Sequence, residues 1–215
     1  INEYAPAIYK FDATKMARNI TMARNDIREH RPVSVYIGAG TKDLSAERIE
    51  ELLNRLERAL VRINQYDMKY DEVAFKRGID AAFMKAQTTA ESRGRANVQS
   101  SAGAQGWNQF MPETAKQYGV NPWDVNESIE GQGKYLSYLL DFFHGDYRKA
   151  AAGYNWGEGH VEKAIKRHGA DWENYIPQET KIYLSDIFFY LQMMQSRDPL
   201  WSPPAGAAVS ASADS

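Results

Sequence analysis

The most informative part of the sequence begins with Glu91-Ser92 and continues, after a short polar gap, as SSAGAQGWNQFMPETA over residues 100–115. A helical pattern leads directly into Glu91, so this glutamate is expected at the end of a helix. Gly103 and Gly106 then predict a turn, because glycine adopts positive φ easily and lets the backbone approach a ligand closely. Pro112 suits the first turn of a second helix. The stretch therefore predicts two helices that present one carboxyl group beside a turn.

The composition fits a globular chain with one main core. The chain has 215 residues, of which 43% are hydrophobic and 12% aromatic, and this size suits one domain, or one domain with a smaller appendage. The formal net charge is −2 and no basic run occurs, which argues against a nucleic-acid partner or an anionic membrane surface. No apolar run approaches the ~20 residues that span a bilayer, and the first residues do not show the pattern expected of a signal peptide. Cysteine is absent, which excludes disulfides and thiolate metal sites.

Hydrophobic periodicity predicts a mainly α fold. Ser45 is expected as an N-cap, because a stripe of apolar residues at helical spacing follows it over residues 49–63. Val33, Val35 and Ile37 alternate with polar residues, but this strand signal is weak. Helices are expected over residues 14–29, 45–63, 71–90, 112–117, 126–143, 146–154, 160–168 and 177–195, with residues 155–159 as a turn.

Glu91 is the candidate acid. Cleavage of a glycosidic bond needs a proton donor to the leaving oxygen, and a carboxyl group can donate when its pKa is raised. The negative end of a helix and a low-dielectric wall both disfavour ionisation. Taken alone, Glu91 is better explained as a surface residue paired with Arg95, since most glutamates are solvated. Only the surrounding motif favours a catalytic role.

Two later segments contain further candidates. Tyr154-Asn155 precedes a glycine-rich turn, where a phenol and an amide can hydrogen-bond a sugar and its N-acetyl group; a buried core tyrosine is the alternative. Glu179-Thr180 is followed by Tyr183 in the expected first turn of the last helix. A glutamate is electrostatically favoured there, so capping alone would explain Glu179.

Taken together, these four segments resemble the lytic transglycosylases, whose fold is similar to goose-type lysozyme. The family pattern is E-S, then S-x-x-G-A-x-G-x-x-Q-x-M-P-x-T-A, then A-x-Y-N-x-G-x-G, then E-T-x-x-Y. This chain matches it, in order, at Glu91-Ser92, Ser100–Ala115, Ala152–Gly159 and Glu179–Tyr183. The resemblance covers residues 79–190, about half of the chain.

The resemblance implies an enzyme that cuts the glycan of peptidoglycan with Glu91 as its single catalytic acid. In this family the glutamate protonates the β-1,4 bond between N-acetylmuramic acid and N-acetylglucosamine. It then takes the proton of the muramoyl C6 hydroxyl, which closes a 1,6-anhydro ring without water. The resemblance also implies substrate-binding roles. Ser100, Gln109 and Tyr154 are expected to line the glycan groove, Asn155 to shape the turn, and Glu179 to border the subsites or hold the last helix.

Two adjacent positions depart from the family. The usual leucine followed by methionine or phenylalanine is replaced by Trp107 and Asn108. We expect Asn108 to present an amide to the groove in place of an apolar side chain, and so to bind substrate differently.

Three regions and several functional alternatives complete these expectations. Residues 1–70 form a predicted N-terminal helical extension, residues 71–195 the catalytic domain, and residues 196–215 a flexible tail rich in Pro, Ala and Ser.

The functional alternatives to a lytic transglycosylase are a hydrolytic muramidase on the same fold, and a glycan-binding structural module of a virion or secretion machine. The expected partner is peptidoglycan, and the expected place of action is the periplasm or cell wall, with virion association as a variant. No cofactor or metal is expected, since His144, His160 and His168 lack ligand-like spacing.

Overall fold

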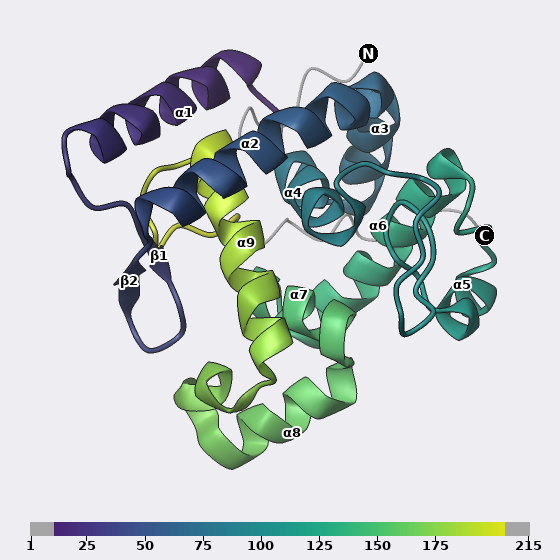
Figure 1. Ribbon diagram of the computed structural model, residues 1–215. Coiled ribbons are helices and arrows are strands. Elements are labelled where there is room, and N and C mark those ends of the chain that lie inside the picture. The colour runs from purple at the N-terminus through teal and green to yellow at the C-terminus, as the bar shows by residue number, and fades with distance from the viewer. Residues whose placement is uncertain (1–10, 205–215) are drawn as a thin grey trace.

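The computed structural model describes residues 11–204 and is dominated by helices (Figure 1). Strands β1 (Ser34–Tyr36) and β2 (Thr41–Asp43) form a small antiparallel hairpin, with Val35 opposite Lys42. This confirms the mainly α prediction. The helices are α1 (Ala13–Arg28), α2 (Ala46–Ile63), α3 (Asp67–Arg77), α4 (Ala81–Ser92), α5 (Pro112–Tyr118), α6 (Val125–Phe142), α7 (Tyr147–Trp156), α8 (Glu158–His168) and α9 (Gln178–Met194), with 3-10 turns η2 (Asn64–Tyr66) and η3 (Gly169–Tyr175).

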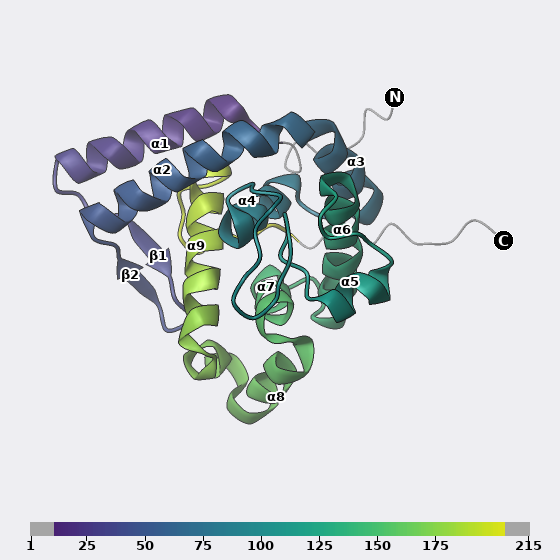
Figure 2. The ribbon, with the colours of Figure 1, turned by 45° about the vertical axis from the view of Figure 1, so that its right-hand side comes forward.

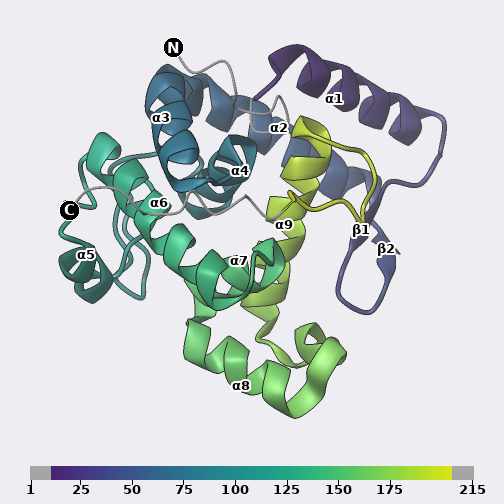
Figure 3. The same cartoon turned by 180° about the vertical axis from the view of Figure 1, so that it is seen from behind.

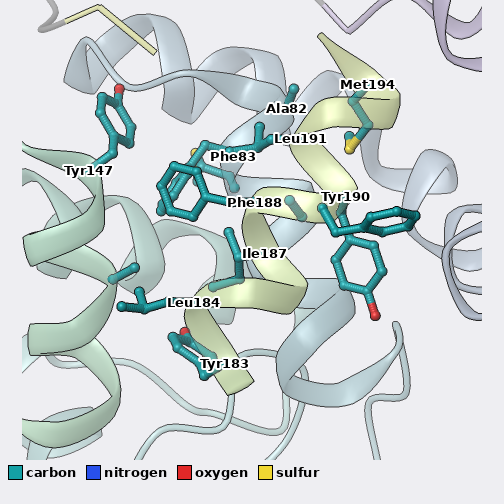
Figure 4. Close-up of a cluster of buried hydrophobic side chains, with 14 of the residues drawn as sticks. Ala82, Phe83, Tyr147, Tyr183, Leu184, Ile187, Phe188, Tyr190, Leu191 and Met194 are labelled. Carbon is teal, nitrogen blue, oxygen red and sulfur yellow. The ribbon is translucent and has the colours of Figure 1, made fainter. Parts of the chain in front are cut away.

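Helices α4 and α9 form the centre of the molecule. α9 contacts α1, α2, α4, α7 and β1, and Figures 2 and 3 show it running between the α1–α2 end and the α8 end. Both central helices are buried over most of their length, because a helix enclosed on all sides has no solvated face. Phe83 of α4 meets Phe188 of α9 edge to face, with ring centroids 6.2 Å apart (Figure 4). This contact fixes the helix that carries Glu91.

The single helix expected over residues 71–90 is instead two helices. α3 ends at Gly78, whose φ of +65° is a left-handed conformation that glycine adopts without a Cβ penalty. Asp80 then caps α4 by accepting a hydrogen bond of 2.8 Å from the Phe83 backbone N–H. The prediction missed the break because the apolar spacing continues across it.

The turn expected over residues 155–159 is also mostly helical. α7 continues through Trp156, and α8 begins at Glu158. Gly157, with φ of +100°, is the one residue between them, so it alone makes the bend. At the other end of the chain, the Ser45 cap is confirmed, since its side chain accepts from the Arg48 backbone N–H at 3.1 Å.

The N-terminal helices share the core of the rest of the chain. Ile20 and Ala23 of α1 lie in the same buried cluster as α4 and α9. Asn19 of α1 donates its amide hydrogen to the Met193 carbonyl oxygen over 3.0 Å. The expected boundary after residue 70 falls inside α3. The expected apolar stripe of α2 is buried at Ile49, Leu52, Leu53, Leu56, Leu60 and Ile63.

The beginning of the expected tail is held on the fold. Arg197 donates to Asp26 of α1 over 2.5 Å, and Trp201 packs against the core. Residues 205–215 lie outside the described residues. Across residues 11–204, none of the helices has the length and hydropathy that a membrane span requires.

Candidate active site

Glu91 lies half-buried in the last turn of α4, which Arg93 caps with a left-handed backbone. Tyr183 of α9 donates its hydroxyl hydrogen to Glu91 Oε1 over 2.7 Å. Arg95, the partner that a surface glutamate would take here, instead donates Nε to the Ser92 carbonyl oxygen at 3.0 Å. Glu91 therefore faces a phenol rather than a guanidinium.

This environment changes the acidity of Glu91. Burial raises the pKa of Glu91 from 4.5 to about 8, the hydrogen bond from Tyr183 opposes the rise, and the negative charge of Glu179 adds to it. A carboxyl group with this pKa keeps its proton at neutral pH and can donate it. Because the pKa lies near the working pH, the same group can also take a proton back, as a general acid that later acts as a base must do.

Tyr183 is held in turn by a chain of buried amides. Gln87 Nε2 donates to the Tyr183 hydroxyl oxygen over 2.9 Å, and Gln132 Nε2 donates to Gln87 Oε1 over 2.8 Å. Asn108 Nδ2 donates to Gln132 Oε1 over 3.2 Å. Gln87, Gln132 and Asn108 are fully buried, and buried amides are stable where they are hydrogen-bonded as these are.

Asn108 does not face outward as expected. Its exposed fraction is 0%, and its side chain is enclosed by polar groups of the core. Oδ1 accepts from Thr88 Oγ1 at 2.7 Å, and Nδ2 donates to the Ser128 carbonyl oxygen at 3.2 Å. An apolar side chain in this position would leave these buried groups unpaired, which is costly. Asn108 therefore belongs to the interior behind the site, and its side chain is not placed to touch a substrate.

Gln109 and Ser100 shape the loop between α4 and α5. Gln109 has a φ of 52°, and its Nε2 donates to the carbonyl oxygens of Gly106 at 2.8 Å and Val98 at 3.1 Å. Gly106 is required there, since a Cβ at this position would lie 2.0 Å from the Pro122 carbonyl oxygen. Ser100 is exposed, and its Oγ accepts from the Ala104 backbone N–H at 3.0 Å. Both predicted groove residues thus have a structural partner within or beside the loop.

Tyr154, Asn155 and Glu179 lie around the helices that face α4. The Tyr154 hydroxyl donates to the Asn108 carbonyl oxygen over 3.0 Å. Burial raises the pKa of Tyr154, and the charge of Glu91 raises it further, so these two groups interact electrostatically. Asn155 Oδ1 accepts from Thr180 Oγ1 at 2.9 Å, which ties α7 to α9. Glu179 is exposed in the first turn of α9.

The structure thus groups some predicted residues and separates others. Tyr154 and Glu179 each interact electrostatically with Glu91. The Ser100 side chain, in contrast, forms its hydrogen bond within its own loop. The amides of Gln87 and Gln132 were missed. Their signal was a polar side chain on an otherwise buried helix, which the sequence alone does not distinguish from a solvated position. Among the residues that the structure describes, no group of three or more His, Cys, Asp or Glu side chains could hold a metal ion.

Comparison with known proteins identifies the family to which the chain is similar. The model of the transglycosylase SLT domain matches residues 69–176. Membrane-bound lytic murein transglycosylase F of Pseudomonas syringae pv. syringae is 30% identical over 161 residues, which cover 71% of this chain and 30% of that protein. Membrane-bound lytic murein transglycosylase D of Escherichia coli K12 is 36% identical over 107 residues, covering 41% of this chain and 24% of that protein.

Solved structures show the same fold. The 70-kDa soluble lytic transglycosylase in complex with bulgecin A aligns with a TM-score of 0.62 at 19% identity, covering 94% of this chain and 34% of that one. The lytic transglycosylase Slt of Pseudomonas aeruginosa, in an inactive glutamate-to-glutamine mutant, aligns with a TM-score of 0.54 at 19% identity, covering 90% and 39%. This chain spans about a quarter to a third of the length of the curated relatives that it matches. By the match of the family model over half its length, the chain belongs to the transglycosylase SLT domain family.

Proposed function

We propose that this chain is a peptidoglycan lytic transglycosylase in which Glu91 acts first as general acid and then as general base. The observation that carries the proposal is the raised pKa of Glu91, about 8, in a half-buried site where a tyrosine is its hydrogen-bond partner. Membership of the family and the names of the relatives, which are lytic murein transglycosylases, support the substrate class. The place of action that follows is the bacterial cell wall or periplasm.

In this mechanism Glu91 donates its proton to the oxygen of the MurNAc–GlcNAc bond as that bond breaks. The resulting carboxylate accepts the proton of the C6 hydroxyl, whose oxygen closes the 1,6-anhydro ring. Tyr183 can stay hydrogen-bonded to Glu91 in both steps, because its hydroxyl donates to Glu91 Oε1 and stabilises the carboxylate that forms. No second carboxylate is needed, since the sugar supplies the nucleophile.

The alternative of a hydrolytic muramidase would draw on Glu179. Its charge acts on Glu91, so it is the acid best placed to activate a water molecule. Its exposure and its place in the first turn of α9 favour the plainer role of helix end and subsite border. Membership of a virion or secretion assembly stays a prediction from the sequence, as do the roles of Ser100, Gln109, Tyr154 and Asn155 toward substrate.

The test compares Glu91→Gln with Glu179→Gln on purified murein sacculi, with release of soluble glycan as the readout. We expect Glu91→Gln to lose at least about 10²-fold in turnover, the lower range of general acid–base contributions, and to keep its fold. Glu179→Gln is expected to raise KM with a smaller change in kcat. Residual turnover of Glu91→Gln above a tenth of wild type, with a Tm no lower than that of the wild type, would assign the acid elsewhere.

A further inference from the structure

A groove beside the end of α4 carries a concentration of positive charge. It has a volume of about 660 Å³ and lies between the outer face of α2 and the loop that follows Glu91-Ser92. Five arginines line it, together with one acidic residue, Glu51. These arginines are Arg55, Arg58 and Arg62 of α2, and Arg93 and Arg95 of the loop.

Most of this charge is not neutralised within the protein. Glu51 is already bound by Arg48 at 2.9 Å and by Arg55 at 2.5 Å. Arg62 donates to the carbonyl oxygen of Arg93 at 2.7 Å, and so uses a neutral acceptor. Arg95 likewise donates to a backbone carbonyl oxygen. Within residues 11–204, no ion pair involves Arg58, Arg62, Arg93 or Arg95, although Arg24, Arg31, Arg48, Arg55, Arg77, Arg148 and Arg197 all have carboxylate partners.

This arrangement costs stability in the free protein. The chain has a net charge of −2, so the groove is not the local part of a generally basic surface. Burial lowers the pKa of Arg93, and the positive charges of Arg55 and Arg95 lower it further, which means that these cations repel one another. Arg93 also has a φ of 57°, a conformation that side chains other than glycine rarely adopt. Unpaired guanidinium groups gathered in a groove are suited to bind oxyanions that accept two parallel hydrogen bonds, above all carboxylates and phosphates.

We propose that this groove binds the carboxylates of the peptides attached to the glycan strand. The proposal rests on the proposed function, because it takes the peptide-bearing glycan strand as the substrate of the chain. Arg93 lies two residues after Glu91, so a ligand in the groove is next to the end of the catalytic helix. The proposed peptide site also gives α2 of the N-terminal region a role in substrate binding. A phosphate-bearing wall polymer offers the same anionic chemistry, and the experiment separates the two sources.

The test measures equilibrium binding by calorimetry in the Glu91→Gln background, where no substrate is consumed. The probes are a murein disaccharide with its peptide, the same disaccharide without peptide, and a teichoic acid fragment. We expect the double substitution Arg58→Gln/Arg93→Gln to weaken binding of the peptide-bearing probe about tenfold, the equivalent of one lost charge-assisted hydrogen bond. Binding of the peptide-free probe should not change. The control is Arg167→Gln on α8, an exposed arginine outside the groove, which should leave all three affinities unchanged.

Three outcomes would overturn the proposal: equal affinity of the two disaccharides for the parent protein, an equal loss for both in the double variant, or tighter binding of the teichoic acid fragment than of the peptide-bearing disaccharide. The last would assign the groove to phosphate. Removing the charge of Arg93, which Arg55 and Arg95 repel, should also raise the Tm of the free double variant, a readout that does not depend on activity. Failure of the wild-type chain to cleave murein would count against the proposed function alone, because binding is measured separately.

A second inference comes from the buried hydrogen-bond chain behind Tyr183. All the hydrogen bonds of this chain can run in one direction, each residue donating to the next one toward Glu91. Trp107 Nε1 donates to the Tyr70 hydroxyl at 2.7 Å, which leaves the Tyr70 hydrogen for Thr88 Oγ1, also at 2.7 Å. Thr88 then donates to Asn108. The complete order is Trp107, Tyr70, Thr88, Asn108, Gln132, Gln87, Tyr183 and Glu91.

We infer that Gln87, Gln132 and Asn108 are positioning residues that fix the Tyr183 hydroxyl hydrogen on Glu91. Hydrogen bonds aligned in one direction polarise each other, so a donor to the Tyr183 oxygen strengthens the bond that Tyr183 gives. Since that bond lowers the pKa of Glu91, loss of Gln87 should raise it.

A double-mutant cycle tests this inference through the pH dependence of kcat/KM. Gln87→Met should move the alkaline limb, where protonated Glu91 is lost, to higher pH. In a Tyr183→Phe background the same substitution should produce no further shift. Thr89→Val is the control, because Thr89 is buried on the same helix but its recorded side-chain hydrogen bond goes to the Lys85 carbonyl oxygen. An unmoved limb in Gln87→Met, or a shift that persists without the Tyr183 hydroxyl, would reduce Gln87 to a packing role.

Discussion

At the scale of single residues, the site depends on one carboxyl group kept neutral by its surroundings. Glu91 forms no ion pair with any residue in the described part of the chain, and its recorded hydrogen bond comes from Tyr183. A phenol stabilises a carboxylate less than a guanidinium would, so the cost of burial decides the pKa. Ionising Glu91 in the folded protein therefore costs free energy, and this cost should be measurable as a dependence of the unfolding free energy on pH.

Substitution Glu91→Gln should reveal that dependence. The pKa of Glu91 is about 8 in the folded protein against 4.5 for the ordinary group, so the folded state binds more protons between these values. The stability that protonated Glu91 allows is fully present below pH 4.5 and is lost as the pH rises toward 8. The amide introduced by the substitution does not titrate, so we expect the variant to gain more in Tm at pH 8 than at pH 4.5. Differential scanning calorimetry at both pH values checks this, and an equal gain at the two would show that Glu91 titrates normally.

At the scale of elements, the position of Glu91 depends on where α4 begins. Asp80 caps this helix with its carboxylate, and burial raises the pKa of Asp80 to about 6. The cap therefore has two opposite effects: its oxygen satisfies the first N–H groups of α4, while its buried charge costs stability above its pKa. Gln195 reduces that cost by donating its amide to Asp80 Oδ2 at 3.3 Å.

Two substitutions separate these effects. Asp80→Ala removes the cap and should cost about 1–2 kcal/mol of unfolding free energy at pH 7. Asp80→Asn keeps a capping oxygen without the charge and should retain most of the stability at that pH. The wild-type stability contribution of Asp80 should fall as the pH rises from 3.8 to about 6, and Asp80→Asn should not show this fall. Urea unfolding at several pH values is the measurement, and equal losses in the two variants would mean that the charge, not the cap, matters.

At the scale of the whole molecule, the N-terminal helices and the matched family region share one core. α2 packs on α4 and α9, and its buried stripe belongs to the same cluster as Phe83 and Phe188. The functional division after residue 70 remains a prediction, but the packing predicts that the two parts do not fold independently.

Leu53→Ala tests this shared core. Leu53 is fully buried on α2, so truncation should cost about 2–5 kcal/mol. We expect circular dichroism and the fluorescence of the five tryptophans to report one transition that moves as a whole. Val61→Ala on the same helix is the control, since Val61 is 71% exposed and should change stability little. Two separate transitions, of which only one responds to Leu53→Ala, would show independent units.

The sequence predicted the helices better than it predicted the surroundings of Glu91, whose role as the acid stays a prediction. Apolar spacing is a local signal, so the α2 stripe and its Ser45 cap were found. The break at Gly78 was missed, because one left-handed residue interrupts a helix without interrupting its apolar pattern. Asn108 was expected in a groove and lies in the core, because its partners on α4 and α6 are far away in sequence. Local pattern identifies which residue type is unusual, whereas only the fold shows what encloses it.

In the proposed mechanism Glu91 alone drives an intramolecular ring closure on the glycan. Mass spectrometry of the soluble products from purified murein tests it most directly, with Glu91→Gln treated in parallel. We predict 1,6-anhydromuramoyl ends, lighter by one water molecule than hydrolysed ends, from the wild-type chain and almost no product from the variant. Reducing muramoyl ends as the main product would exclude ring closure and assign the chain to hydrolysis.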